Sequence, residues 1–288
     1  MKKLLLIILG IALIVSASMQ FFSQNKEPVQ ETITFFPIDS NAYYLSAYTT
    51  LIETPKYDVE WNTSSVLDRK AYLRQDVSLL FSNGRLINKM GEWRIDTSKL
   101  FQKKTVPIKQ NGILDSVTFH YSELHPKGGR IFSAQTMTSD ILYFFESSKQ
   151  LPHFFSKPKT QEEQKWKTEL EVNEKNILDH AFAKGVRRFS IPSDRYDSYP
   201  LTKFVFGRNE TIPGFSQAVT SRILGNLWEG IYKNYFLGIK KRNGATTDPV
   251  GSTIPIILIA KDHSHLLVLF EAADGEPIYL RQLIEGDR

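Results

Sequence analysis

The sequence predicts an α+β protein: an N-terminal signal or anchor helix, then an extracytoplasmic domain with antiparallel β-hairpins, two long helices and a C-terminal three-strand meander. Three observations predict this fold class. An apolar run follows two lysines at the chain start. Strand and helix patterns then occur in runs, without regular β–α–β alternation. Asn-Gly and Asp-Gly pairs separate apolar segments, as expected for tight hairpin turns.

The composition restricts the class of protein. Of 288 residues, 41% are hydrophobic and 23% are charged, which is typical of a globular chain with a packed core. The absence of cysteine excludes disulfides, thiolate metal sites and cysteine nucleophiles. The net charge of +5 comes from scattered lysines and arginines, whereas nucleic-acid-binding proteins cluster them, so we expect no nucleic-acid partner. A mildly basic protein suits an anionic membrane or envelope.

Residues 1–22 predict a signal peptide or an N-terminal membrane anchor. Lys2 and Lys3 precede an apolar run from Leu4 to Val15, and small residues follow. Cleavage after Ala17 would give a secreted protein. If the segment is retained, residues 4–22 are just long enough as a helix to span a bilayer core of about 30 Å. The lysines favour a cytoplasmic N-terminus and an extracytoplasmic domain held by this single helix.

Residues 23–32 are polar and predict a tether, and residues 33–288 predict the extracytoplasmic domain. Two prolines suggest a candidate internal boundary near 149–160. A helix is expected from Asp39 or Ser40, with Leu45, Tyr48 and Ile52 on one face.

The next segments predict β-structure. Residues 76–95 predict a hairpin, because Asn83-Gly84 can supply the two positive φ angles of a type I′ turn. Residues 116–124 predict a strand. Residues 138–147 fit a strand or a helix.

Two helices are then expected. The first covers 161–184, with a capping box formed by Thr160 and Glu163 and a stop at Gly185. The second covers 216–237 and has an apolar face wide enough for burial between two layers. Trp166 and Trp228 lie on the apolar faces of these helices, so both are expected to be largely buried.

The chain ends in a predicted meander of strands over 253–260, 266–272 and 277–284. Asp274-Gly275 supplies its second turn.

His120 and Glu123 are weak catalytic candidates within residues 116–125. On a strand, alternate side chains point to opposite faces, so Phe119, Tyr121 and Glu123 share one face and His120 lies on the other. His120 and Glu123 therefore cannot hold one metal ion together. The pattern favours an ordinary strand.

His263 and His265 are further weak catalytic candidates, in a predicted hairpin turn where polar residues are common. Arg195, Tyr196 and Tyr199 are weak ligand-binding candidates in the segment 192–200, because tyrosine and arginine are enriched at interaction surfaces. The alternative is a solvated loop whose tyrosines pack on the core.

No P-loop, dinucleotide fingerprint, EF-hand or G-x-S-x-G motif is present, and we expect no cofactor and no metal site. We therefore expect a non-catalytic envelope-associated domain that binds a cell-wall component or a membrane-protein partner. The alternative is an exported hydrolase whose site is assembled from distant residues such as His120, Glu123, His263 and His265.

Overall fold

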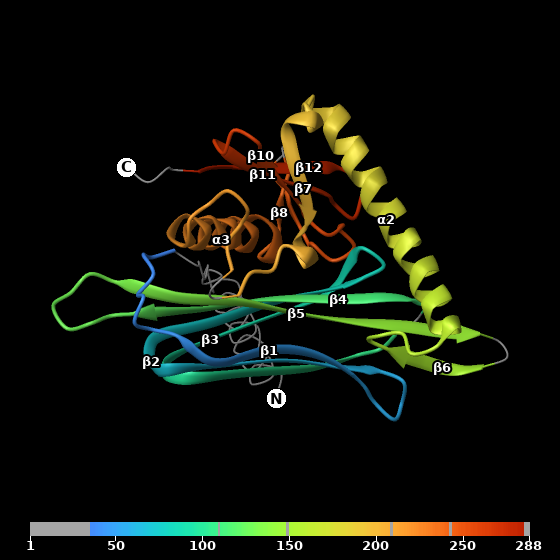
Figure 1. Cartoon of the computed structure of the whole chain (residues 1–288), viewed down its shortest axis with the longest axis horizontal. Coiled ribbons are helices and arrows are strands. Elements are labelled where there is room, and N and C mark those ends of the chain that lie inside the picture. Colours follow the sequence, from blue (N-terminus) through green and yellow to red (C-terminus); the bar gives the residue numbers. More distant parts are fainter. Residues whose placement is uncertain (1–34, 109, 148–149, 208–209, 242–243, 285–288) are drawn as a thin grey trace, which may run out of the picture. The chain divides into compact units, whose positions relative to one another are not determined.

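The computed structural model describes residues 35–284, except positions 109, 148–149, 208–209 and 242–243. The expected membrane segment (1–22) and tether (23–32) lie outside the described residues. Residues 33–288 group into one compact unit. This unit combines antiparallel sheets with two long helices, which confirms the α+β class (Figure 1).

The first sheet is antiparallel and has the strand order β1-β2-β4-β5-β6, with β3 also paired to β2. Its strands are β1 (Tyr44–Glu53), β2 (Val59–Ser82), β3 (Arg85–Val106), β4 (Gly112–Leu124), β5 (Phe132–Ser147) and β6 (Gln150–Phe155). The long strand β2 pairs with β1 through its first half and with β4 through its second half. The turn between β2 and β3 has positive φ at both Asn83 and Gly84, as expected.

The first sheet curls until β1 approaches β5, which makes it nearly a closed barrel. The contacts across this seam are made largely by side chains. The Leu51 amide donates to the Asp140 carboxylate at 2.7 Å, and the Thr49 and Thr138 hydroxyl oxygens lie 2.7 Å apart. One face of the sheet therefore becomes an enclosed interior.

The second sheet is antiparallel and has the order β12-β11-β10-β7. It contains β7 (Tyr196–Pro200), β10 (Ile256–Ala260), β11 (His265–Glu271) and β12 (Pro277–Leu283), and a small separate ribbon joins β8 (Ile239–Lys240) to β9 (Thr246–Thr247). Strands β10, β11 and β12 are the expected meander, and Gly275 in its second turn has φ of 84°. Strand β10 is buried along its whole length because it lies centrally in the sheet.

Two long helices accompany the sheets. Helix α2 (Gln161–Phe189) begins with the predicted Thr160–Glu163 capping box. Helix α3 (Gln217–Ile231) is capped by Ser216 and continues into a π-helical turn, η3 (Tyr232–Phe236). Two short 3₁₀ turns, η1 (Ser193–Arg195) and η2 (Leu201–Lys203), flank β7. The boundary expected near 149–160 falls where the chain passes from β6 to α2.

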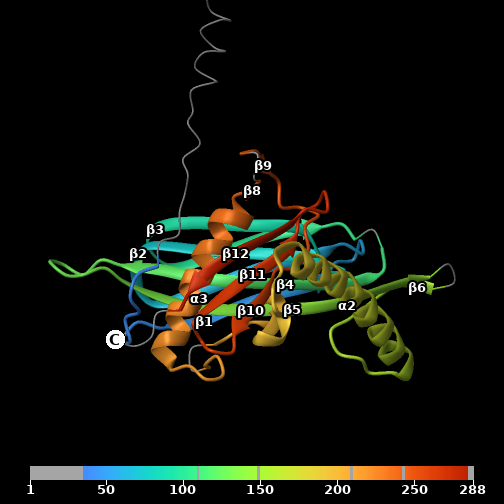
Figure 2. The same cartoon turned by 90° about the horizontal axis from the view of Figure 1, so that it is seen from above.

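Helix α3 lies between the two sheets, and α2 runs obliquely beside them from β6 to the second sheet (Figures 1 and 2). The largest core cluster joins one face of β2 and β4 to α3 and to the second sheet. Trp228 of α3 is fully buried there and stacks on Phe119 of β4, with ring centroids 5.3 Å apart. Burial of a helix between two apolar layers explains its wide apolar face.

Three local expectations were wrong. The helix expected from residue 39 is strand β1, and Leu45, Tyr48 and Ile52 are 61%, 45% and 50% exposed. Pairing with β2 overrides the helix-like spacing of these residues. Helix α2 does not stop at Gly185 but continues to Phe189. Gly185 packs closely on the second sheet, because an added Cβ there would lie 2.5 Å from a Leu269 methyl carbon.

The third expectation concerned Trp166, which is half-buried rather than largely buried. Its ring stacks on Phe145 at the edge of the first sheet, with centroids 4.3 Å apart. Helix α2 packs obliquely against the sheet, so its first turns are covered on one side only. Residues 138–147, which fitted either a strand or a helix, form the second part of β5.

Candidate functional site

A chain of polar side chains occupies the interior of the first sheet. His120 on β4 lies directly opposite Asp76 on β2 in the strand register, and its Nδ1 is 2.8 Å from Asp76 Oδ2. On its other side, His120 Nε2 is 2.9 Å from the Thr138 hydroxyl on β5. Side chains of both His120 and Asp76 are almost fully buried. Alternation along paired strands places these groups on one face.

Further hydroxyl groups extend this chain. Thr49 Oγ1 lies 2.7 Å from Thr138 Oγ1 and 2.6 Å from Thr118 Oγ1. Thr118 Oγ1 in turn is 2.6 Å from Ser78 Oγ. A buried polar group is costly without a hydrogen-bond partner, and here each hydroxyl supplies a partner for the next.

The charge of Asp76 is balanced inside the sheet. Arg74 NH2 lies 3.7 Å from Asp76 Oδ1, and the Ser65 hydroxyl donates to Asp76 Oδ2 at 2.6 Å. The Arg74 guanidinium also lies over the Tyr44 ring, 5.0 Å from its centroid. Burial raises the pKa of the Tyr44 phenol, so this side chain stays neutral.

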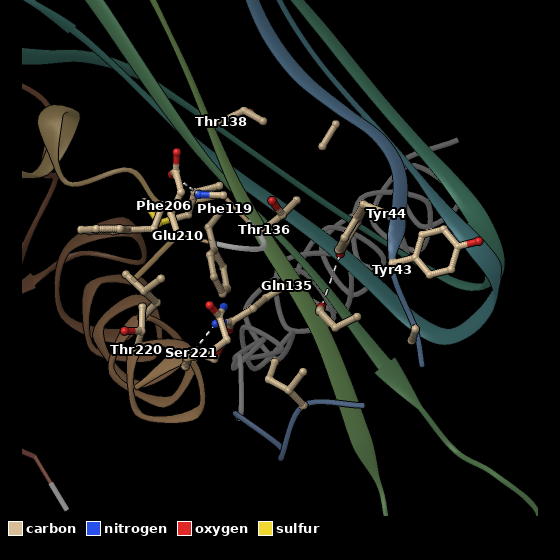
Figure 3. A pocket seen from close by; sticks show the side chains of 18 of the residues that line it. Tyr43, Tyr44, Phe119, Gln135, Thr136, Thr138, Phe206, Glu210, Thr220 and Ser221 are labelled. Carbon is tan, nitrogen blue, oxygen red and sulfur yellow. Dashed lines mark hydrogen bonds between the residues drawn. The ribbon is translucent and has the colours of Figure 1, made fainter. Parts of the chain in front are cut away.

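A cavity of about 490 Å³ opens beside this polar interior, and we call it the β1–β5 pocket. Its walls come from β1 and the residues before it, from β5, from the segment around Phe206 and from α3. Figure 3 shows Tyr44 reaching across to β5, and Gln135 of β5 reaching to α3, where its side-chain amide donates to the Ser221 carbonyl at 2.6 Å. Thr138 lines the pocket and so connects it to His120.

The β1–β5 pocket has both polar and apolar surface. None of its described lining residues is lysine, arginine or histidine, and its charged members are Asp39 and Glu210. Aromatic rings such as Tyr44 and Phe206 stand beside hydroxyl and amide side chains. The buried Gln135 Oε1 has no hydrogen-bond partner among the described residues. The described lining therefore offers aromatic rings, hydroxyl groups, amide groups and two carboxyl groups to a ligand.

The residues around His120 form a strand, β4, as the alternation predicted. His120 faces the interior of the sheet, and Glu123 points to the other face, where it accepts from His125 Nε2 at 3.2 Å. The His125 ring stacks on Tyr72, with centroids 3.9 Å apart. His120 and Glu123 thus belong to separate groups of contacts.

His263 and His265 lie at the β10–β11 turn of the second sheet. The His263 ring packs against Phe215 at 4.4 Å between centroids. His265 Nε2 is 2.9 Å from the Tyr196 hydroxyl, and burial lowers the pKa of His265. Its neutral form is therefore favoured in this contact.

The candidates of the segment 192–200 are placed on and beside β7. Arg195 is exposed at the end of η1, while Tyr196 and Tyr199 are half-buried against the main core. Tyr199 packs on Phe204, with centroids 5.8 Å apart. These side chains do not line the β1–β5 pocket.

Within the part of the chain that the structure describes, no three His, Asp or Glu side chains converge in a way that could hold a metal ion. In the same residues, no helix is both long and apolar enough to cross a membrane. No protein-family model, curated protein or solved structure matches the chain.

Proposed function

We propose that this chain is an exported or membrane-anchored binding domain of the cell envelope, with the β1–β5 pocket as its ligand site. One observation carries the proposal: the described lining of the pocket combines aromatic rings with many hydroxyl and amide side chains. Sites of this kind suit sugars and peptides better than phosphates or carboxylates. Cell-wall glycan, which carries many hydroxyl and amide groups, is the ligand class that fits best.

The binding test uses full-length protein and oligomers of N-acetylglucosamine as a soluble, uncharged probe. Saturation-transfer NMR should detect binding of the glycan. Gln135→Leu and Thr136→Val, which remove polar groups of the pocket, should weaken it about tenfold or more, equivalent to about 1.4 kcal/mol. Thr105→Val, at an exposed position of β3, is the matched control. Binding that is equal in all variants would refute the assignment of the pocket.

The proposed location rests on Lys2, Lys3 and the apolar run behind them. Protease added to intact, wall-stripped cells should digest the domain, whereas complete protection would refute export. N-terminal sequencing then distinguishes cleavage of the N-terminal segment from its retention. A mature chain that starts at Ser18 is secreted, and an intact Met1 or Lys2 identifies a membrane anchor.

A second candidate function, ester hydrolysis, is favoured by the Asp76–His120–Thr138 arrangement at the pocket wall. In this reaction Thr138 Oγ1 attacks the ester carbonyl carbon, and its proton passes to His120 Nε2 and then to the departing alcohol. A water molecule releases the acid and restores the hydroxyl.

This alternative is tested with p-nitrophenyl acetate. Turnover that disappears in both Thr138→Val and His120→Asn, with an acetyl mass adduct on Thr138, would replace the binding proposal. Equal rates for these variants and the parent protein would exclude it.

A further inference from the structure

A second cavity, of about 410 Å³, lies between α2 and the two sheets, and we call it the α2 cavity. It is separate from the β1–β5 pocket and shares none of its lining residues. Its apolar wall includes Ile113 and Ile141 of the first sheet, Leu178 and Phe182 of α2, and Ile256 of the second sheet. Such a wall suits the apolar body of a small molecule.

A buried pair of carboxyl groups stands at this cavity. Glu174 lines it from α2 and is 9% exposed. Asp115 of β4 is 3% exposed and is connected to the cavity through the lining residue Lys203. Asp115 Oδ2 and Glu174 Oε2 are both buried and have no hydrogen-bond donor among the described residues. Lys203 Nζ lies 3.3 Å from the other oxygen of Asp115. With both carboxyl groups ionised, one lysine therefore faces two negative charges.

The other charged groups around the cavity do not supply the missing donor. Glu171 accepts from the Tyr143 hydroxyl at 2.8 Å and pairs with Lys167 at 3.4 Å. Lys175 pairs with Asp179 on the exposed side of α2. The lining therefore has an excess of negative charge next to the two unsatisfied oxygens.

When no ligand is present, a proton on one of the two carboxyl groups can supply the missing hydrogen-bond donor. Burial, and then the charge of Asp115, raises the pKa of Glu174 to about 8. Burial raises the pKa of Asp115 as well, while Lys203 and, to a smaller extent, a hydrogen bond with Glu174 oppose that rise. Near neutral pH the protonated form of Glu174 is therefore favoured, and its proton can be shared with Asp115.

We propose that the α2 cavity binds an organic ammonium ion with a small apolar body, whose N–H groups replace the proton shared by Asp115 and Glu174. An ammonium group supplies both the donors and the positive charge that the pair lacks. The apolar body would lie against the isoleucine, leucine and phenylalanine side chains of the wall. An anionic ligand is disfavoured, because the positive charge of Lys203 is already paired with the Asp115 carboxyl group.

Proton release distinguishes this site from a purely apolar one. Since the ammonium ion replaces a proton, its dissociation constant should fall as the pH rises toward about 8, by up to about tenfold per pH unit. Above that range Glu174 is already ionised and the dependence should level off.

The experiment is isothermal titration calorimetry of full-length protein in nanodiscs with cyclohexylammonium, with empty nanodiscs subtracted. Cyclohexanol and cyclohexanecarboxylate are the probes without positive charge. We expect one saturable site for cyclohexylammonium, and proton release should appear as a dependence of the heat on the ionisation enthalpy of the buffer. Cyclohexanol should bind at least about tenfold more weakly.

Glu174→Gln and Asp115→Asn should each weaken cyclohexylammonium binding at least about tenfold and remove its pH dependence. Glu169→Gln, at an exposed position of the same helix, is the matched control and should bind as the parent does. Circular dichroism and the melting temperature verify that each variant is folded. Absence of saturable binding to the parent, equal binding by Glu174→Gln, or preference for the carboxylate would overturn the proposal. None of these outcomes bears on export or on the β1–β5 pocket.

Discussion

Replacing Glu174 with glutamine should change how the stability of the protein depends on pH. The pKa of Glu174 is raised from 4.5 to about 8 in the folded protein, mainly because the group is buried. Between these values the folded state holds a proton that the unfolded state has lost. The stabilisation from this proton is therefore complete below the unfolded pKa and is lost as the pH rises toward about 8.

The magnitude follows from linkage between protonation and folding. A shift of one pKa unit corresponds to about 1.4 kcal/mol, so the full shift of Glu174 corresponds to about 5 kcal/mol. Between about pH 5.5 and pH 8, a single group with these two pKa values costs about 3 kcal/mol of stability. Glutamine resembles the protonated acid at every pH, and it can still donate to Asp115. Glu174→Gln should therefore lack this loss.

The assay is urea unfolding of full-length protein, followed by tryptophan fluorescence at both pH values. The parent and Glu174→Gln should differ little at about pH 5.5, and the variant should gain about 3 kcal/mol relative to the parent at about pH 8. Glu169→Gln, which changes an exposed side chain, should follow the parent at both pH values. Parallel pH profiles for Glu174→Gln and the parent would refute the raised pKa of Glu174.

Three further outcomes are expected. Trp228→Ala should cost about 3–5 kcal/mol of unfolding free energy, because Trp228 is fully buried between the sheets; a loss below about 1 kcal/mol in urea unfolding would contradict this packing. His120→Ala should cost about 3–5 kcal/mol by the same measurement, since it removes a partner from the buried Asp76 carboxylate, and an unchanged unfolding midpoint would contradict it. Gly225→Ala would place a Cβ 1.9 Å from the Phe35 ring and displace that ring from α3, so limited proteolysis near Phe35 should accelerate. The free energy of unfolding should change by only about 1 kcal/mol, and an unchanged cleavage pattern would contradict the Gly225–Phe35 contact.

Local sequence signals determined a large part of the fold. The β2–β3 turn was predictable because Asn83-Gly84 accepts positive φ angles. The start of α2 was predictable because Thr160 and Glu163 satisfy the first backbone amides of the helix. The C-terminal meander was predictable because short apolar runs alternate with turn residues. Each of these signals acts within a few residues and needs no distant partner.

Tertiary structure decided the elements whose local signal was ambiguous. Leu45, Tyr48 and Ile52 have the spacing of a helix face, but the segment pairs with β2 and becomes a strand. The end of α2 was also set at a distance, because Gly185 packs on Leu269 of the second sheet and the helix continues past it. Local propensity differs little between such alternatives, so the better-packed one prevails.

The candidate sites depend almost entirely on the tertiary structure. Alternation along β4 predicted that His120 and Glu123 face opposite ways, but not which groups His120 would meet. Asp76 lies 44 residues and Thr138 lies 18 residues from His120, and only the strand register brings them together. The pairing of Asp115 with Glu174 likewise requires α2 to pack on β4. A sequence shows which side chains share a face of one strand, whereas register and packing, which are non-local, decide what those side chains contact.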